Sequence, residues 1–173
     1  MELNNVSETH EEQQNLGLPV VTCHSAIFSI ADNQLVLLLA ERNEGPFRFQ
    51  WELPGTTPAL TEELSASAIR ASTPPLAPSV IDDLQQLGVY GEPTRDPRHR
   101  SIALVYWGVT RHSNIDTASS ELELIPVSDW RSDDFRFAFD HLQIATDALK
   151  ALRRSLNSTS LATRLCASTF TIS

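Results

Sequence analysis

A strand, a tight turn and a helix that must stop early lie in the middle of this chain and constrain its fold most. Residues 49–53 alternate between apolar and polar side chains, which is typical of a half-buried strand, and Pro54-Gly55 ends it. Residues 61–72 then carry apolar side chains at helical spacing. Pro74-Pro75 ends this helix, because proline lacks the amide donor and clashes with the preceding turn.

The helix predicted over 61–72 has a favourable start. Thr61 can serve as its N-cap, and Glu62 and Glu63 occupy the first turn, where the helix dipole favours acids. Arg70 lies near its end.

Strands surround this unit. Residues 20–30 and 35–40 are apolar and flank Asp32-Asn33, which predicts a β-hairpin. The unbroken apolarity of 35–40 predicts that both faces of this strand are covered, as in a sheet between helices. Further strands are predicted at the end of 80–89, over 101–110 and over 122–126.

A long helix is predicted to begin at Asp140, which with Gln143 resembles a capping box. Its apolar residues form one continuous stripe at helical spacing. The stripe consists of Leu142, Ala145, Leu149, Leu152 and Leu156.

Length and composition indicate one packed domain. The chain has 173 residues, 41% hydrophobic and 20% charged, which is typical of a globular protein. We expect a domain over 18–156, a disordered acidic tail over 1–17 and a polar, partly helical extension over 157–173. The formal charge of -9 argues against a nucleic-acid-binding surface over the whole protein, because phosphate binding needs a basic face.

The chain is expected in the cytoplasm and outside membranes. Its 2 cysteines are too few for a disulfide framework or a zinc site. The segment 1–16 has neither the basic start nor the apolar core of a signal peptide, and no apolar run reaches the roughly 20 residues of a membrane helix.

A proline-broken loop over 91–100 contains Arg95, Arg98 and Arg100. Guanidinium groups match phosphate geometry through two parallel hydrogen bonds, so this loop is a candidate phosphate site. The alternative is that these arginines pair with the protein's own carboxylates.

The order of these elements resembles the Nudix fold over about residues 20–156, which implies an α/β (α+β) sandwich with a mixed sheet between helices. The family's Nudix box is a glycine followed at fixed spacing by a glutamate, an arginine-glutamate pair, two more glutamates and a glycine. With Thr56 at the usual second glycine, Glu62 falls on the first glutamate and Arg70 on the arginine. The remaining positions fall on Ala71, Pro74, Pro75 and Ala77. The box is therefore degenerate.

Two motifs resemble the ADP-ribose-type branch, which includes Nudix-related transcriptional regulators of NAD and sugar metabolism. They are residues 84–88 followed by 95–98, and residues 139–141 at a helix start. The resemblance implies a degenerate Nudix domain that binds an effector such as ADP-ribose, followed by a winged helix-turn-helix. Residues 169–173 resemble the start of that second domain, and nucleic-acid binding is expected only through it.

The degenerate box bears on catalysis. Nudix hydrolysis needs Mg²⁺ held by oxygen ligands, and Glu62 by itself cannot hold the ion. Glu63, Asp82 or Asp83 could replace the missing ligands, so a Mg-dependent hydrolase of ADP-ribose or a related nucleoside diphosphate derivative is the alternative, with Glu62 and Arg70 as its catalytic candidates. In the family Arg70 braces the box acids; a surface ion pair is its alternative role. Otherwise we predict no cofactor.

The prediction is a sensor or regulator domain that binds a nucleotide sugar or phosphorylated metabolite. Its pocket is expected between residues 42–51 and the arginine loop. Arg95 and Arg98 are expected to face phosphate, with Arg42, Phe47, Trp51 and Arg100 completing the site. A third possibility is a non-enzymatic homodimer that acts through the basic segment 150–164.

Overall fold

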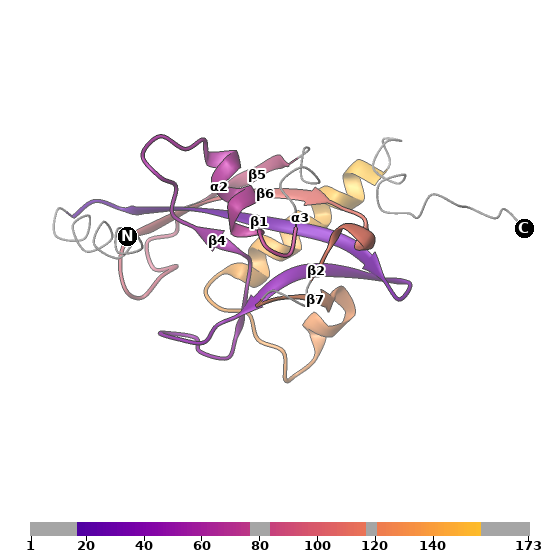
Figure 1. The fold of residues 1–173 in the computed structure, drawn as a ribbon. Coiled ribbons are helices and arrows are strands. Elements are labelled where there is room, and N and C mark those ends of the chain that lie inside the picture. Colours follow the sequence, from indigo (N-terminus) through magenta and orange to yellow (C-terminus); the bar gives the residue numbers. More distant parts are fainter. Residues whose placement is uncertain (1–16, 77–83, 117–120, 157–173) are drawn as a thin grey trace, which may run out of the picture.

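The structure is a computed structural model that describes residues 17–76, 84–116 and 121–156. In these residues the chain folds into a mixed sheet with a helix on each side (Figure 1). The strands are β1 Val20–Ala31, β2 Gln34–Glu41, β3 Trp51–Glu52, β4 Gly55–Thr56, β5 Gln85–Tyr90, β6 Ser101–Val109 and β7 Leu122–Pro126. The helices are α2 Leu64–Ala71 and α3 His141–Leu156, with short 3-10 turns at His112–Asn114 and Val127–Arg131. Within these residues the strand order is β3-β2-β1-β6-β5, with β4 beside β1 and β7 beside β2.

Strand β1 is the centre of this sheet. It pairs in parallel with β6 over residues 20–28 and antiparallel with β2 over residues 28–31. Asp32 and Asn33 form the hairpin turn with φ of 48° and 62°, a conformation that these two residue types tolerate well. The predicted hairpin is confirmed.

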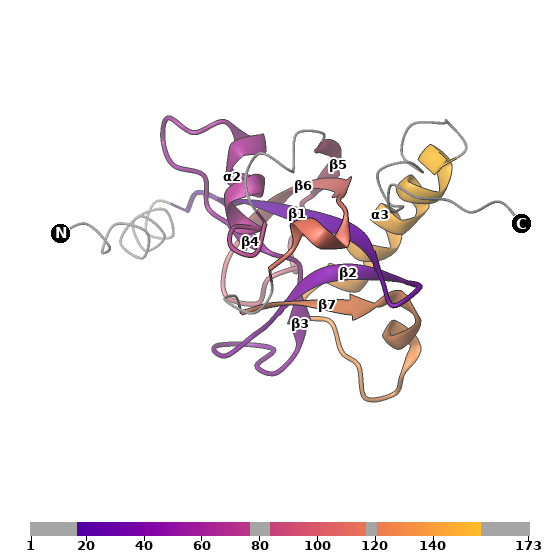
Figure 2. The ribbon, with the colours of Figure 1, turned by 45° about the vertical axis from the view of Figure 1, so that its right-hand side comes forward.

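Both faces of the sheet are buried, as Figure 2 shows from the positions of α2 and α3. Phe28 and Leu37 pack with α3 residues in the larger core cluster, whereas Ile27 and Leu38 belong to the smaller cluster on the α2 side. Neighbouring residues of a strand point to opposite faces, so continuous apolarity supplies two cores. Each fully buried side chain of this size stabilises the fold by roughly 1.5–3 kcal/mol. The prediction of a sandwich with covered faces is confirmed.

Helix α3 begins where expected but turns a different stripe toward the sheet. Its buried residues are His141, Ile144, Ala145, Ala148, Leu149, Ala151 and Leu152. Leu142 lies off this stripe and is 49% exposed, and Leu156, the last residue of the helix, is 39% exposed. The apolar stripe predicted from the sequence therefore extends beyond the buried face of the helix at these two leucines.

Helix α2 is shorter than predicted at its start. It begins at Leu64, and Glu63 at the N-cap position makes no side-chain capping bond. Thr61 and Glu62 lie before the helix because the Glu62 carboxylate folds back to accept hydrogen bonds from the Ala59 amide and the Ser67 hydroxyl. The end agrees with the prediction, with Ser72 as C-cap directly before the proline pair.

The strand predicted over 49–53 is reduced to Trp51–Glu52. Phe49 is 65% exposed and has a φ of 65°, which is incompatible with an extended strand. The chain instead folds back on itself, with the Phe49 amide donating to the Arg42 carbonyl at 2.8 Å.

Some predictions fall outside the described residues. These are the tail over 1–16, the extension over 157–173, and Ala77, Asp82 and Asp83. Among the residues that are described, no helix is both long and apolar enough to cross a membrane.

Candidate functional site

The two box residues that fit the Nudix pattern bind each other. Arg70 donates from Nε and Nη2 to the two Glu62 carboxylate oxygens at 2.8 and 2.7 Å. It also donates to Thr56 Oγ1 at 3.1 Å and to the Thr57 carbonyl at 3.0 Å. The hydrogen bonds from Arg70 are the main reason that the pKa of Glu62 is lowered to about 2. Arg70 therefore braces the turn before α2 and also forms the surface ion pair that was its alternative role.

These residues do not fit a metal ion. The Glu62 oxygens already accept hydrogen bonds from Ala59, Ser67 and Arg70. Ala71, Pro74 and Pro75 have no side-chain oxygen to offer where the family has glutamates. Within the described ranges there is no group of three or more His, Cys, Asp or Glu side chains that could hold a metal ion.

The two segments predicted to form the ligand pocket meet at Phe139. The Arg42 guanidinium carbon lies 4.8 Å from the centre of the Phe139 ring, and that of Arg98 lies 5.5 Å from it. The Phe47 ring packs edge-on against the same ring, with centroids 4.8 Å apart. The structure thus brings Arg42, Phe47 and Arg98 together as predicted, around an aromatic residue that had no predicted role in the site.

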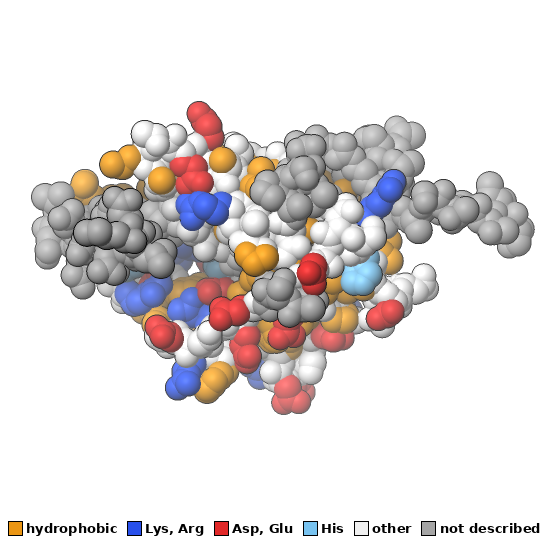
Figure 3. All heavy atoms as spheres, in the orientation of Figure 1, with side chains coloured by type: hydrophobic (Ala, Val, Ile, Leu, Met, Phe, Trp, Pro, Cys, Tyr) orange, Lys and Arg blue, Asp and Glu red, His pale blue; other side chains and the backbone are white. Residues whose placement is uncertain are grey.

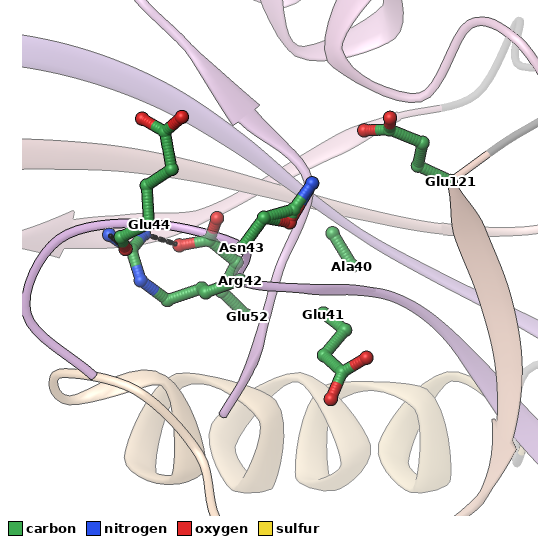
Figure 4. Close-up of a pocket in the computed structure, with 7 residues that line it drawn as sticks. All are labelled: Ala40, Glu41, Arg42, Asn43, Glu44, Glu52 and Glu121. Atoms are coloured by element: carbon green, nitrogen blue, oxygen red, sulfur yellow. Dashed lines mark hydrogen bonds and ion pairs between the residues drawn. The ribbon is translucent and has the colours of Figure 1, made fainter. Parts of the chain in front are cut away.

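Arg42 lines a cavity of about 270 Å³ (Figure 4). Its Nη1 donates to Glu52 Oε2 at 2.5 Å, and its Nε donates to the Pro46 carbonyl at 3.0 Å. Burial raises the pKa of Glu52 even though Arg42 acts in the opposite direction. The cavity is lined by Ala40, Glu41, Arg42, Asn43, Glu44, Glu52 and Glu121.

Arg95 lies inside the protein instead of facing an open surface. It is 8% exposed, and its Nε and Nη2 donate to the two carboxylate oxygens of Asp140 at 2.9 and 2.7 Å. Its Nη1 donates to Ser101 Oγ at 3.2 Å. The expectation that Arg95 faces phosphate does not agree with this geometry, because Asp140, which was predicted only as a helix cap, occupies the guanidinium.

Arg98 and Arg100 are the exposed arginines of the loop. Arg98 is bound by Asp96 through Nε and Nη2, yet 47% of its side chain is exposed. Burial by itself would raise the pKa of the Asp96 carboxyl group. The hydrogen bonds from Arg98 outweigh this effect, so the pKa of Asp96 is lowered. The two arginines line a second cavity of about 260 Å³ with Gly17, Leu18 and His99. Figure 3 shows basic side chains gathered at the lower left of the molecule among acidic ones.

Neither of these two cavities is lined by residues of both predicted segments, although Arg42 and Arg98 both contact the Phe139 ring. Trp51 does not line either of them; its ring stacks on Phe135 at an interplanar angle of 3° with centroids 5.8 Å apart.

Two buried histidines support the strand that leads to the box. The Leu53 amide donates to Nδ1 of His141 at 3.0 Å, and the His141 ring packs edge-on against His24 at 5.1 Å. Burial lowers the pKa of His24 to about 4 and also lowers that of His141. Both rings are therefore neutral near pH 7. Gly55 lies against His24, since a Cβ there would come within 2.1 Å of the imidazole.

Residues 139–141 are the part of the site that the sequence did not reveal. The sequence marked them only as a helix start and as a resemblance to a family motif, without a role in the site. Their partners Arg95 and Leu53 lie 45 and 88 residues away, beyond the reach of local patterns.

No family model matches the chain. It is 28% identical over 160 residues to the ADPR responsive transcriptional repressor NtrR of Acinetobacter baylyi, covering 89% of this chain and 62% of the repressor. The NUDIX domain of Shewanella oneidensis NrtR complexed with ADP ribose is 25% identical, with a TM-score of 0.67, covering 88% of this chain and 99% of that domain.

The structure of Shewanella oneidensis NrtR complexed with a 27mer DNA has a TM-score of 0.69 and 26% identity, covering 79% of this chain. The chain spans 63% of that protein's length, and so less than two thirds of both full-length regulators. Together with the fold and the box frame, these similarities support a Nudix domain of the regulator-related branch of the Nudix superfamily.

Proposed function

We propose that this domain is a sensor that binds ADP-ribose or a closely related nucleotide sugar without hydrolysing it. The observation that carries the proposal is the similarity, over 88% of the chain, to a regulator's Nudix domain complexed with ADP ribose. Assembly as a homodimer and DNA binding through a further domain stay predictions from the resemblance, and cytoplasmic location stays a prediction from the composition.

The arginine cluster supplies the chemistry for such a ligand. A pyrophosphate is an anion, and guanidinium groups bind phosphate oxygens through charge-assisted hydrogen bonds. Arg98 is suited to this contact because 47% of its side chain is exposed while Asp96 fixes its orientation. The Arg42 guanidinium contacts the same Phe139 ring as Arg98, so a residue of the 42–51 segment lies close to the arginine loop.

Arg98→Ala is expected to weaken ADP-ribose binding at least tenfold, about 1.4 kcal/mol, because a charge-assisted hydrogen bond to phosphate is lost. Isothermal titration calorimetry with ADP-ribose measures this. Arg131→Ala removes the same charge from an exposed position in the 3-10 turn Val127–Arg131 and should leave the affinity unchanged. Absence of heat with the wild type, or equal losses in both variants, contradicts the proposal.

The domain is expected to release no AMP from ADP-ribose in the presence of Mg²⁺. The physical reason is that Ala71, Pro74 and Pro75 replace the oxygen ligands of the family's box. Chromatography of the nucleotide after long incubation, with a Nudix pyrophosphatase as positive control, tests this. Magnesium-dependent turnover that disappears in Glu62→Gln would instead establish the hydrolase alternative.

A further inference from the structure

We propose that Asp140 is a positioning residue of the ligand site, acting together with Phe139. The two residues hold the arginines of two separate segments in the arrangement that binds phosphate, without touching the ligand themselves. The inference rests on the proposed function, since it concerns the same site.

Asp140 fixes the arginine loop through Arg95. Both carboxylate oxygens accept hydrogen bonds from the Arg95 guanidinium, at 2.7 and 2.9 Å. The pair is largely withdrawn from water, with 4% of the Arg95 side chain and 19% of the Asp140 side chain exposed. A two-point ion pair of this kind fixes orientation as well as distance. Arg95 precedes Arg98 by three residues, so the pair sets the path of the backbone that carries Arg98.

Phe139 fixes the exposed ends of the arginines. Its φ of 53° is uncommon for a bulky residue and persists only where the surroundings impose it. In this conformation its ring is contacted by the guanidinium groups of Arg42 and Arg98, at 4.8 and 5.5 Å. Guanidinium groups favour such positions over aromatic rings.

The next residue secures the same segment to the strand before the box. His141 Nδ1 accepts the Leu53 amide at 3.0 Å. Phe139, Asp140 and His141 are consecutive, and between them they contact Arg42, the arginine loop and the strand before the box. The start of α3 is the common support of the site.

A positioning role makes a prediction opposite to that of simple electrostatics. Asp140 is negative, so its removal near an anion site should strengthen the binding of an anion if only charge mattered. If Asp140 positions Arg95 and the loop, its removal weakens binding, because the arginines lose their fixed arrangement and ordering them opposes association. The sign of the change in affinity separates the two cases.

Asp140→Asn is expected to weaken ADP-ribose binding at least tenfold in calorimetric titration, and Asp140→Glu should recover part of that loss. Asp134→Asn makes the same change of charge at an exposed residue and should change the affinity less than twofold. Near-ultraviolet circular dichroism establishes that each variant is folded. A folded Asp140→Asn that binds as tightly as the wild type, or more tightly, overturns the inference.

Phe139→Leu decides the matter if Asp140→Asn does not fold. It keeps the ion pair with Arg95 and removes only the aromatic ring, and it should weaken binding at least threefold. Unchanged affinity in Phe139→Leu in that case overturns the inference. The wild-type titration separates the two proposals: no binding overturns both, whereas wild-type binding with unaffected variants overturns only the positioning role.

Discussion

Gly55→Ala is expected to lower the free energy of unfolding by about 3 kcal/mol, because the new methyl group would overlap the buried His24 ring and force it out of place. The new Cβ would lie 2.1 Å from Nδ1 and 2.2 Å from Cε1 of His24, the residue directly opposite Gly55 on β1. The imidazole has little freedom to move aside. It is 9% exposed, its Nε2 is 3.0 Å from the Thr22 hydroxyl, and it packs against His141.

Urea denaturation measures this loss as a lower midpoint with an unchanged slope. Gly88→Ala is the matched control, since a Cβ there meets only Tyr90, at 3.9 Å. A double variant, His24→Ala with Gly55→Ala, tests the cause. The alanine at position 55 should cost far less once the imidazole is absent, which a double-mutant cycle detects as strong coupling. Equal midpoints for wild type and Gly55→Ala would show that the ring can move.

Acid is expected to remove stability on the order of 3 kcal/mol between pH 6.5 and about 4, through His24. Burial is the main cause that lowers the pKa of this histidine from 6.5 to about 4. In this window the unfolded chain binds the proton and the folded protein does not, so stability falls as the pH falls. Below about pH 4 both states are protonated and this loss is complete. His141 acts in the same direction.

Denaturation midpoints measured from pH 7 to pH 4 give this slope. His24→Gln should flatten it, whatever its effect on stability at pH 7. His112→Gln removes an exposed histidine and should leave the slope intact. The contribution of carboxylates can be separated from that of His24 by its pH range. The lowered pKa of Glu62 stabilises the folded protein, and this stabilisation is lost only as the pH falls below the ordinary value of 4.5. A slope that does not depend on His24 contradicts the prediction.

The strands could be predicted because the residues that are buried in them are neighbours in the sequence, and a local run of apolar side chains identifies them. Phe28 and Leu37 face the core on one side of the sheet, and their neighbours Ile27 and Leu38 face the core on the other side. One apolar run in each strand therefore supplies residues to both cores. The start of α2 could not be predicted, since Glu62 favours a helix by propensity but is drawn into hydrogen bonds with Arg70 and Ser67. Tertiary contacts overrode a local preference there.

The site was predicted in outline and not in detail. The arginine loop and the 42–51 segment were identified by the family resemblance together with the loop pattern, and both contact Phe139. The roles of individual arginines depend on partners far away in the sequence. Arg95 and Arg98 cannot be told apart by their neighbours in the sequence, since both lie in the same proline-broken loop. In the structure, Arg95 is buried in an ion pair with Asp140, whereas Arg98 is paired with Asp96 and about half of its side chain is exposed.

Helix α3 connects the candidate site to a distant part of the domain. It has 16 residues, so it extends about 24 Å from His141 to Leu156 at 1.5 Å per residue. At its first end, Phe139 contacts Arg42 and Arg98, and Asp140 is hydrogen-bonded to Arg95. The rest of the helix packs on the sheet. A tilt of roughly 5° about the first end displaces the other end by about 2 Å, within the range of helix shifts known to transmit signals. At this length, a tilt of the helix about His141 would produce its largest displacement at Leu156.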